Sequence, residues 1–369
     1  MRRPWVLPLL VVLGACSSGT LRPLPAELPQ NPKLLGVRQA WTATIGEVSF
    51  PLDVKVVGQS VALASSDGSV SVLDARTGDR LWQAAAGDSL AAGVGFDGRL
   101  AAVMTLKNEL VVMESGRELW RQRMAAPSFT SPFVAGERVF VLGADRAVTA
   151  FDGQTGRKIW TQQRPGEALV LRQAGVMLAV GDTLVVGLSG KLVGLNPLSG
   201  SVRWEAAIAS PRGTNDVERL VDLVAPASRQ GNIVCARAFQ SAVGCVDAVR
   251  GAVVWTKLAS GSIGLNGDDK LAVGVESDGS LLAWRRADGE RVWTVEKFRY
   301  RNFTAPLVVG RSVVLGEDTG TLHFLSIDDG SMQTRIDTDG SPLAVAPVLA
   351  GNTLIVVTRR GGVFGLRPE

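Results

Sequence analysis

Most of the chain consists of short apolar runs separated by turns that contain Gly, Asp or Asn. The string SDGSVSVLDARTGDRLW, which ends at Trp82, shows the unit: an alternating apolar and polar run, a turn, and a second run that ends in Trp. Alternation with a period of two predicts β-strands with one buried face. The same unit recurs in strings that end at Trp120, Trp160, Trp204, Trp255 and Trp293. The pattern therefore predicts an all-β protein built from repeats.

The spacing between the turn glycine and the tryptophan is constant in six copies. The Trp lies four positions after the Gly in the pairs Gly78 and Trp82, Gly116 and Trp120, Gly156 and Trp160, Gly200 and Trp204, Gly251 and Trp255, and Gly289 and Trp293. Gly permits a positive φ at the turn, and a Trp one strand later can fill the gap between neighbouring repeats. We therefore interpret these tryptophans as structural.

Two further copies of the repeat are degenerate. The seventh, EDTGTLHFLSIDDGSMQT, keeps Gly330 but has Thr334 where the Trp should be, and the eighth, RRGGVFGLRPE, stops at the end of the chain. A weaker strand also precedes each pair and is often opened by Pro and split by Gly, as at Pro132, Pro306 and Pro347. Four strands per unit, with a spacing of about 38 to 51 residues between tryptophans, fit the blade of a β-propeller.

The first strand of the propeller is expected to complete its last blade. Trp41 belongs to a strand that follows no hairpin, whereas the hairpin at 359–366 has no strand after it. If the two pair, the ring closes between the chain ends and no open sheet edge remains. We predict an eight-bladed propeller of four-stranded antiparallel blades over residues 38–369. Seven blades is the alternative, because the first and last copies are degenerate.

The N-terminal residues read as an export signal and a tether. Arg2 and Arg3 precede an apolar run of about nine residues, too short to cross a bilayer, that closes on Leu-Gly-Ala-Cys at Cys16. This ending resembles the lipobox of bacterial lipoproteins, which implies a signal peptide at 1–15, lipidation of Cys16 and, with Ser17 next, a place in the outer membrane facing the periplasm. An ordinary secretory signal with a chance cysteine is the alternative. Residues 16–37 contain four prolines and predict an extended spacer.

Composition excludes several classes of function. The net charge is only +4 and no basic run occurs, so a nucleic-acid partner is not expected. No apolar stretch after the signal reaches eighteen residues, so no membrane-spanning helix is expected. The chain has one histidine, His323, and one tyrosine. Since His323 lies within a strand pattern, we expect a sheet position there, with no catalytic residue, no metal site and no cofactor.

Two repeats resemble those of pyrroloquinoline-quinone-type propellers. The strings DARTGDRLW (74–82) and DGQTGRKIW (152–160) match the Asp…Thr-Gly-x-x-x-Trp pattern of such blades nearly verbatim. This resemblance makes a quinone-dependent dehydrogenase the first alternative function. The dehydrogenases have an adjacent pair of cysteines beneath the quinone, and this chain has no such pair. A generic protein- or sugar-binding propeller lipoprotein is the other alternative.

The lipobox, the Pro-rich tether and eight quinone-type blades together resemble the propeller lipoproteins of the outer-membrane β-barrel assembly machinery. In that family two loops face the periplasmic repeat domains of the barrel-forming subunit. ALVLRQAG (168–175) and PRGTNDVERLVDLVAP (211–226) are similar to these loops. The resemblance implies a non-enzymatic scaffold, with nascent outer-membrane proteins as a further partner. The partner-binding residues it implies are Leu169, Leu171, Arg172, Arg219, Leu220 and Asp222.

The chemistry of these residues suits a compact interface. Two leucines and an arginine offer an apolar anchor and a planar set of donors, and Asp222 could orient Arg172 or meet a basic residue of the partner. Val224 stands where the family has a second Asp, which weakens the acidic part of the contact. The alternative is that Leu169 and Leu171 alternate along a buried strand, with Arg172 in solvent.

Cys235 and Cys245 flank one hairpin in a chain expected to reach an oxidising compartment. A three-residue loop at 239–241 would place them opposite each other, whereas a two-residue turn would place them on opposite faces. Cys245 also occupies a position that other copies fill with Ala or Gly. We therefore favour small buried thiols over a disulfide.

Overall fold

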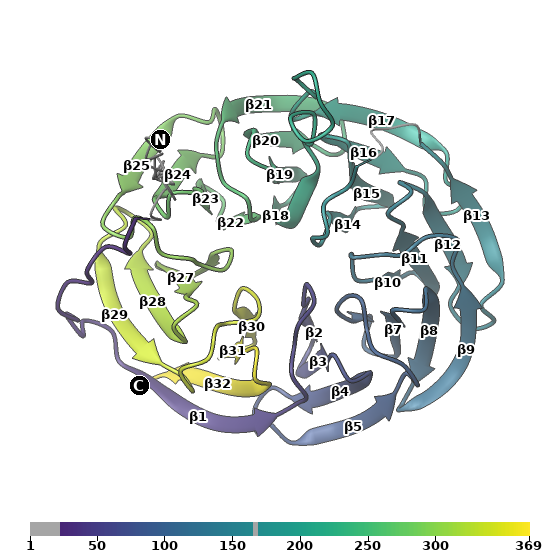
Figure 1. The fold of residues 1–369 in the computed structure, drawn as a ribbon, viewed down its shortest axis with the longest axis horizontal. Helices are drawn as coiled ribbons and strands as arrows, with labels where there is room; N and C mark the ends of the chain where they lie inside the picture. Colours follow the sequence, from purple (N-terminus) through teal and green to yellow (C-terminus); the bar gives the residue numbers. More distant parts are fainter. Residues whose placement is uncertain (1–22, 165–168) are drawn as a thin grey trace, which may run out of the picture.

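The structure is a computed structural model that describes residues 23–164 and 169–369. The described residues form eight four-stranded antiparallel sheets, which Figure 1 shows arranged as blades around one axis. Eight blades rather than seven are thus confirmed, and so is the all-β class. The predicted signal peptide, Cys16 and the first residues of the predicted tether lie outside the described residues.

Each blade takes its strands in sequence order from the axis outward, and the last blade takes its outermost strand from the N-terminus. The first four blades contain β2 (Lys55–Val57), β3 (Ser60–Ala64), β4 (Ser69–Asp74) and β5 (Arg80–Ala85); β6 (Gly95–Phe96), β7 (Leu100–Met104), β8 (Glu109–Glu114) and β9 (Arg117–Arg123); β10 (Phe133–Ala135), β11 (Arg138–Leu142), β12 (Val148–Asp152) and β13 (Lys158–Gln162); and β14 (Met177–Val180), β15 (Thr183–Leu188), β16 (Lys191–Leu195) and β17 (Val202–Ala207). The other four contain β18 (Leu223–Gln230), β19 (Ile233–Ala238), β20 (Ala242–Asp247) and β21 (Ala252–Leu258); β22 (Leu265–Gly267), β23 (Leu271–Val275), β24 (Leu281–Arg285) and β25 (Arg291–Val295); β26 (Leu307–Val309), β27 (Ser312–Gly316), β28 (Thr321–Ser326) and β29 (Met332–Asp337); and β30 (Val348–Ala350), β31 (Thr353–Val357), β32 (Gly362–Pro368) and β1 (Val37–Thr44).

This order defines two faces of the ring. Because successive strands are antiparallel, the hairpin between the second and third strands of every blade lies on the same face as the connection to the next blade. We call this the loop face. The hairpin between the first and second strands of each blade lies on the opposite face.

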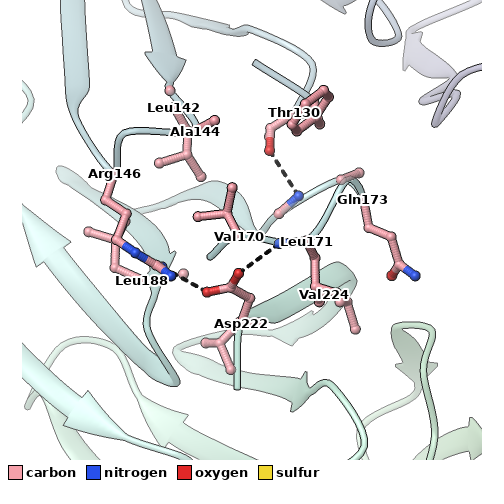
Figure 2. Close-up of a pocket in the computed structure, with 16 residues that line it drawn as sticks. Thr130, Leu142, Ala144, Arg146, Val170, Leu171, Gln173, Leu188, Asp222 and Val224 are labelled. Carbon is pink, nitrogen blue, oxygen red and sulfur yellow. Dashed lines mark hydrogen bonds and ion pairs between the residues drawn. The ribbon is translucent and has the colours of Figure 1, made fainter. Parts of the chain in front are cut away.

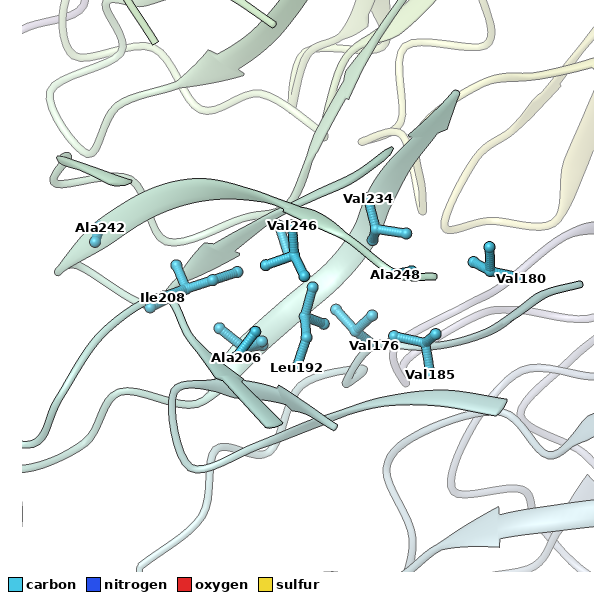
Figure 3. Close-up of a cluster of buried hydrophobic side chains, with 13 residues drawn as sticks. Val176, Val180, Val185, Leu192, Ala206, Ile208, Val234, Ala242, Val246 and Ala248 are labelled. Atoms are coloured by element: carbon cyan, nitrogen blue, oxygen red, sulfur yellow. The ribbon is translucent and has the colours of Figure 1, made fainter. Parts of the chain in front are cut away.

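The core lies between the blades, because each sheet packs on the two next to it. The middle strands are therefore buried on both sides, as in β4, whereas the outer strand β5 is largely exposed. Between the fourth and fifth blades, Figure 3 shows Val185 and Leu192 of one sheet close to Val234 and Val246 of the other. A cavity of about 480 Å³ follows the axis, lined by inner strands and the residues next to them.

The repeated tryptophans join successive blades, as predicted. In the first seven blades the turn glycine packs on the Trp ring of the blade before it; Gly156, for example, has φ +70° and would place a Cβ 2.6 Å from the ring of Trp120. The indole Nε1 of Trp120 donates to the carbonyl oxygen of Gly153 in that next blade at 2.8 Å. Equivalent bonds are made by Trp41, Trp160, Trp255 and Trp293.

The two ends of the chain close the ring in the eighth blade. Strand β1 pairs antiparallel with β32, from Val37 opposite Pro368 to Thr44 opposite Gly362. The predicted closure by the Trp41 strand is confirmed. The amide of Glu369 also donates to the carbonyl oxygen of Gly36 at 3.1 Å. The chain ends therefore meet where every other blade has its outermost hairpin.

Residues 24–35, which we call the N-terminal strap, lie against the propeller. They form no strand, but Leu34 N donates to Gln333 O at 2.8 Å and Ala26 N donates to Arg299 O at 2.9 Å. Figure 1 shows this segment passing outside β29 toward β25. This part of the predicted spacer is thus held on the seventh blade, and the chain does not leave the ring at the last blade.

The two cysteines of the fifth blade differ from the favoured interpretation. Strands β19 and β20 leave the three-residue loop 239–241 between them, so Cys235 lies directly opposite Cys245. The structure joins the two sulfurs in a disulfide. The preference for separate buried thiols is therefore wrong, because the loop length sets the register that brings the two cysteines together.

Candidate docking site

Two connections on the loop face form the candidate site. Residues 169–172 belong to the connection between β13 and β14, and residues 219–222 belong to the connection between β17 and β18. Figure 2 shows Asp222 between Arg146 and the main chain at Leu171. The structure therefore brings together two segments that are about fifty residues apart in the sequence.

The Asp222 carboxylate joins the two connections. Its Oδ1 accepts from Arg146 Nη1 at 2.8 Å, and its Oδ2 accepts from the backbone amide of Leu171 at 3.1 Å. Arg146 Nη2 in turn donates to the carbonyl oxygen of Leu169 at 2.9 Å. Of the two alternatives for Asp222, the first is not what the structure shows: the carboxylate binds Arg146 and the backbone of the 169–172 loop rather than Arg172.

Arg146 is the residue of the candidate site that the sequence analysis missed. It lies in the β11–β12 hairpin with a φ of 62° and is 6% exposed. Other hairpins at this place in the repeat have glycine with positive φ, among them Gly68, Gly279 and Gly320. Since an arginine is costly in that conformation, its presence at a glycine position of the repeat was a signal that could have identified it.

Main-chain contacts fix the far end of the first loop. Gly175 N donates to Thr130 Oγ1 at 2.9 Å, and Gly175 also forms an isolated bridge with Val224. Val224 is 2% exposed. The position where the family has a second Asp is therefore buried against the loop. A small cavity of about 50 Å³ remains between the two connections.

The first loop presents its side chains to solvent. No strand covers 169–172, which contradicts the alternative of a buried strand. Leu169 is 40% exposed, Leu171 is half-buried, and Arg172 is exposed with its Cζ 5.7 Å from the centre of the Phe129 ring. The stacked guanidinium leaves its edge donors available. This loop offers an apolar and cationic surface on a fixed backbone.

Arg219 and Leu220 lie in the turn that precedes Asp222. Both are half-buried, and their amides donate to the carbonyl oxygens of Asn215 and Val217, each at 3.2 Å, within a turn that leads to Asp222. Neither lines the cavity between the connections. Of the six predicted residues, the structure thus brings Asp222 to the 169–172 loop and places Arg219 and Leu220 beside it.

The site contains no cluster typical of metal chemistry. Within residues 23–164 and 169–369, no three His, Cys, Asp or Glu side chains lie together where they could hold a metal ion. The same residues include no helix long and apolar enough to cross a bilayer. The arrangement combines an ion pair that fixes a loop with exposed leucine and arginine side chains, which suits the recognition of a protein surface.

Comparisons with known proteins match this chain to one family. Residues 66–295 match the family described as outer membrane protein assembly factor BamB. A protein of that name from Burkholderia pseudomallei is 38% identical over 98% of this chain and 96% of its own length. The one from Bordetella pertussis is 34% identical over the same shares.

Solved structures agree on the fold. BamB from Moraxella catarrhalis has a TM-score of 0.82 at 21% identity and covers 90% of this chain and 99% of its own. A quinohemoprotein alcohol dehydrogenase from Comamonas testosteroni has a TM-score of 0.67 at 14% identity, over 93% of this chain and 79% of its own, which shows a common fold alone. The sequence identities and the family match together show that this chain belongs to the family of the outer membrane protein assembly factor BamB.

Proposed function

We propose that the chain is a non-enzymatic scaffold subunit of the outer-membrane β-barrel protein assembly complex. It docks on the periplasmic repeat domains of the barrel-forming subunit and supports the insertion of outer-membrane proteins. The names of its relatives support the assembly role. The contact is assigned to Leu169, Leu171, Arg172, Arg219, Leu220 and Asp222.

The observation that carries the proposal is the fixed backbone of the 169–172 loop. Asp222 accepts from the Leu171 amide while Arg146 binds both Asp222 and the Leu169 carbonyl. A loop held in one conformation loses little conformational entropy on binding, so more of the contact energy of its side chains is available for affinity. Leu169 and Arg172 are then the exposed anchors of a small interface.

The proposal also includes an anchor and a second class of partner. Cys16 carries the lipid, and the propeller is held at the outer membrane facing the periplasm. Nascent outer-membrane chains are transient partners, which an exposed outer strand could receive by strand addition. No residue is assigned to catalysis, a metal or a cofactor.

The docking residues are tested by affinity for the periplasmic repeat domains. We expect Leu171→Ala/Arg172→Glu to weaken binding at least tenfold, because the anchor is truncated and a charge is reversed. The matched control is Leu258→Ala/Arg250→Glu, which changes an exposed leucine and an exposed arginine on the fifth blade. Unchanged affinity in the first variant would contradict the site, and equal losses in both would show a general effect of charge.

The non-enzymatic assignment has a separate test. The purified protein is incubated with pyrroloquinoline quinone and calcium, and bound quinone and dye reduction are measured. We expect neither. Turnover of an alcohol under these conditions would favour the dehydrogenase alternative, whereas co-purification with a partner outside the assembly complex would favour a generic binding propeller.

A further inference from the structure

The N-terminal strap pairs with the edge of the seventh blade through one side chain. Asn31 Nδ2 donates to the carbonyl oxygen of Arg335 at 3.1 Å, and the Arg335 amide donates to Asn31 Oδ1 at 3.1 Å. The side-chain amide of Asn31 therefore replaces the two bonds that a neighbouring strand would make to Arg335. Three residues later, Leu34 N donates to Gln333 O at 2.8 Å. The exposed edge of β29 is thereby covered.

Apolar contacts and the side chain of Arg335 hold the strap along the same path. Leu28 packs on the core between the sixth and seventh blades, and Leu35 packs on the core between the seventh and eighth. Arg335 Nη2 donates to the carbonyl oxygen of Pro29 at 2.7 Å. The strap thus spans two blade junctions, with contacts at intervals along its length.

The beginning of the strap is fixed on the loop face. Ala26 N donates to Arg299 O at 2.9 Å, and Arg301 Nε donates to Ala26 O at 2.8 Å. Arg301 is itself paired with Glu317, which opens the β27–β28 hairpin of the loop face. The strap therefore begins on the same face that carries the candidate docking site.

The loop beside this point exposes a tyrosine among charged side chains. Residues 296–301 contain Lys297, Arg299, Arg301 and one acidic side chain, Glu296. Arg299 is paired with Glu296 and Asp278, and Arg301 is paired with Glu317. Tyr300 is 40% exposed and has a φ of 65°. An exposed tyrosine favours the headgroup region of a bilayer.

We propose that the strap pins the lipidated N-terminus at residues 296–301 and turns the loop face toward the membrane surface. The membrane half of this inference rests on the lipidation of Cys16 in the proposed function. Ten residue steps separate Cys16 from Ala26, and at 3.3–3.6 Å each they reach about 35 Å at most. The membrane anchor and the docking site are then held on one face of the ring.

The strap is tested without any lipid, by hydrogen exchange in the full mature chain with Cys16→Ser. We expect Asn31→Ala to accelerate exchange of the Arg335 amide at least tenfold, because that amide loses its only hydrogen-bond acceptor in the strap. The matched control is Asn232→Ala in the exposed β18–β19 hairpin, which should leave this amide unchanged. An Arg335 amide that exchanges equally fast with and without Asn31 would overturn the strap.

The orientation is tested with lipidated protein on phospholipid vesicles that carry a headgroup quencher. A fluorophore is attached at Thr319→Cys on the loop face or at Arg311→Cys on the opposite face of the same blade. We expect at least twofold stronger quenching at 319 than at 311. Leu28→Ser/Asn31→Ala, which changes only the strap, should bring the ratio close to one.

Each outcome separates the two proposals. Equal quenching at the two positions in the parent protein would overturn the membrane-facing arrangement, even if binding to the repeat domains is intact. Failure of the protein to bind vesicles would contradict the lipid anchor of the proposed function and the orientation with it. In either case, the hydrogen-exchange rate of the Arg335 amide tests whether the strap is bound to β29.

Discussion

Seven of the eight junctions between blades share one arrangement, and the remaining junction has another. At seven of them a Trp of one blade packs on the turn glycine of the next, as Trp120 does on Gly156. Between the seventh and eighth blades the Trp position holds Thr334, which is 4% exposed. No outermost hairpin follows there, because the chain ends meet at that place through Glu369 and Gly36.

The difference shows what the Trp requires. The indole ring packs on the turn of the next blade and donates a hydrogen bond to it, and both contacts are missing where that turn is replaced by two chain ends. At the eighth junction the strap covers the edge of β29, and Leu35 packs into the adjacent core. The seventh repeat thus has no Trp at the one junction where the next blade has no turn to receive it.

The largest effect is expected at a junction with a Trp. Trp120→Ala should lower the free energy of unfolding by about 3–5 kcal/mol, because a ring that is 9% exposed is lost together with its bond to the Gly153 carbonyl. Urea denaturation measures this loss. Leu119→Ala on the same strand, at a side chain that is 40% exposed, should change stability by less than about 1 kcal/mol. Equal losses would refute the special role of the Trp.

A smaller effect that depends on pH is expected beside the eighth junction. Burial would raise the pKa of Glu317, but the hydrogen bonds from His323 and Arg301 outweigh it and leave the pKa below its ordinary value. The ionised form therefore stabilises the fold fully above the unfolded pKa of about 4.3. That stability is lost as the pH falls from there through the lower folded pKa.

Glu317→Gln should therefore cost about 2 kcal/mol at pH 7, because the buried Arg301 and His323 lose a charged acceptor. The difference from the parent protein should shrink as the pH falls to 3. The control is Asp318→Asn, at the next position and exposed, which should show little of either effect. A constant loss at every pH would argue against the ion pair as its source.

The smallest effect is expected when the missing Trp is introduced at the junction between the seventh and eighth blades. Thr334→Trp restores the repeat pattern in the seventh blade, yet we expect no gain and a loss of about 1 kcal/mol. The ring would enter a buried position that has no turn to receive it, and overpacking of that kind is destabilising. A clear increase in the urea midpoint would show that the junction can accept a Trp.

The fold could be predicted from the sequence because one structural unit repeats along the chain. The constant spacing from Gly78 to Trp82 and its later copies indicated both the strand order and the contact between blades, since one local geometry recurs. The unpaired strand at Trp41 indicated how the ring closes, and β1 confirms it. His323 lies in β28 bonded to Glu317 at 2.7 Å, which agrees with the predicted sheet position.

The candidate site could be predicted only in part, because its main contacts join residues that are far apart in the sequence. Resemblance to the family indicated Leu171 and Asp222, but no local pattern could show that Arg146, 76 positions earlier, binds Asp222. The strap was missed for the same reason. Its proline content predicts an extended segment but does not indicate which blade that segment contacts. The cysteine pair depended on a loop length that alternation alone left open.

The closure of the ring also sets an order on folding. Strand β1 is made early, whereas its partner β32 follows more than 300 residues later. Strand β1, the outermost strand of the eighth blade, therefore has no partner until β32 has been made. A contact of such long sequence separation forms slowly, so the unpaired strand edges of the incomplete ring are exposed to association with other chains until it closes.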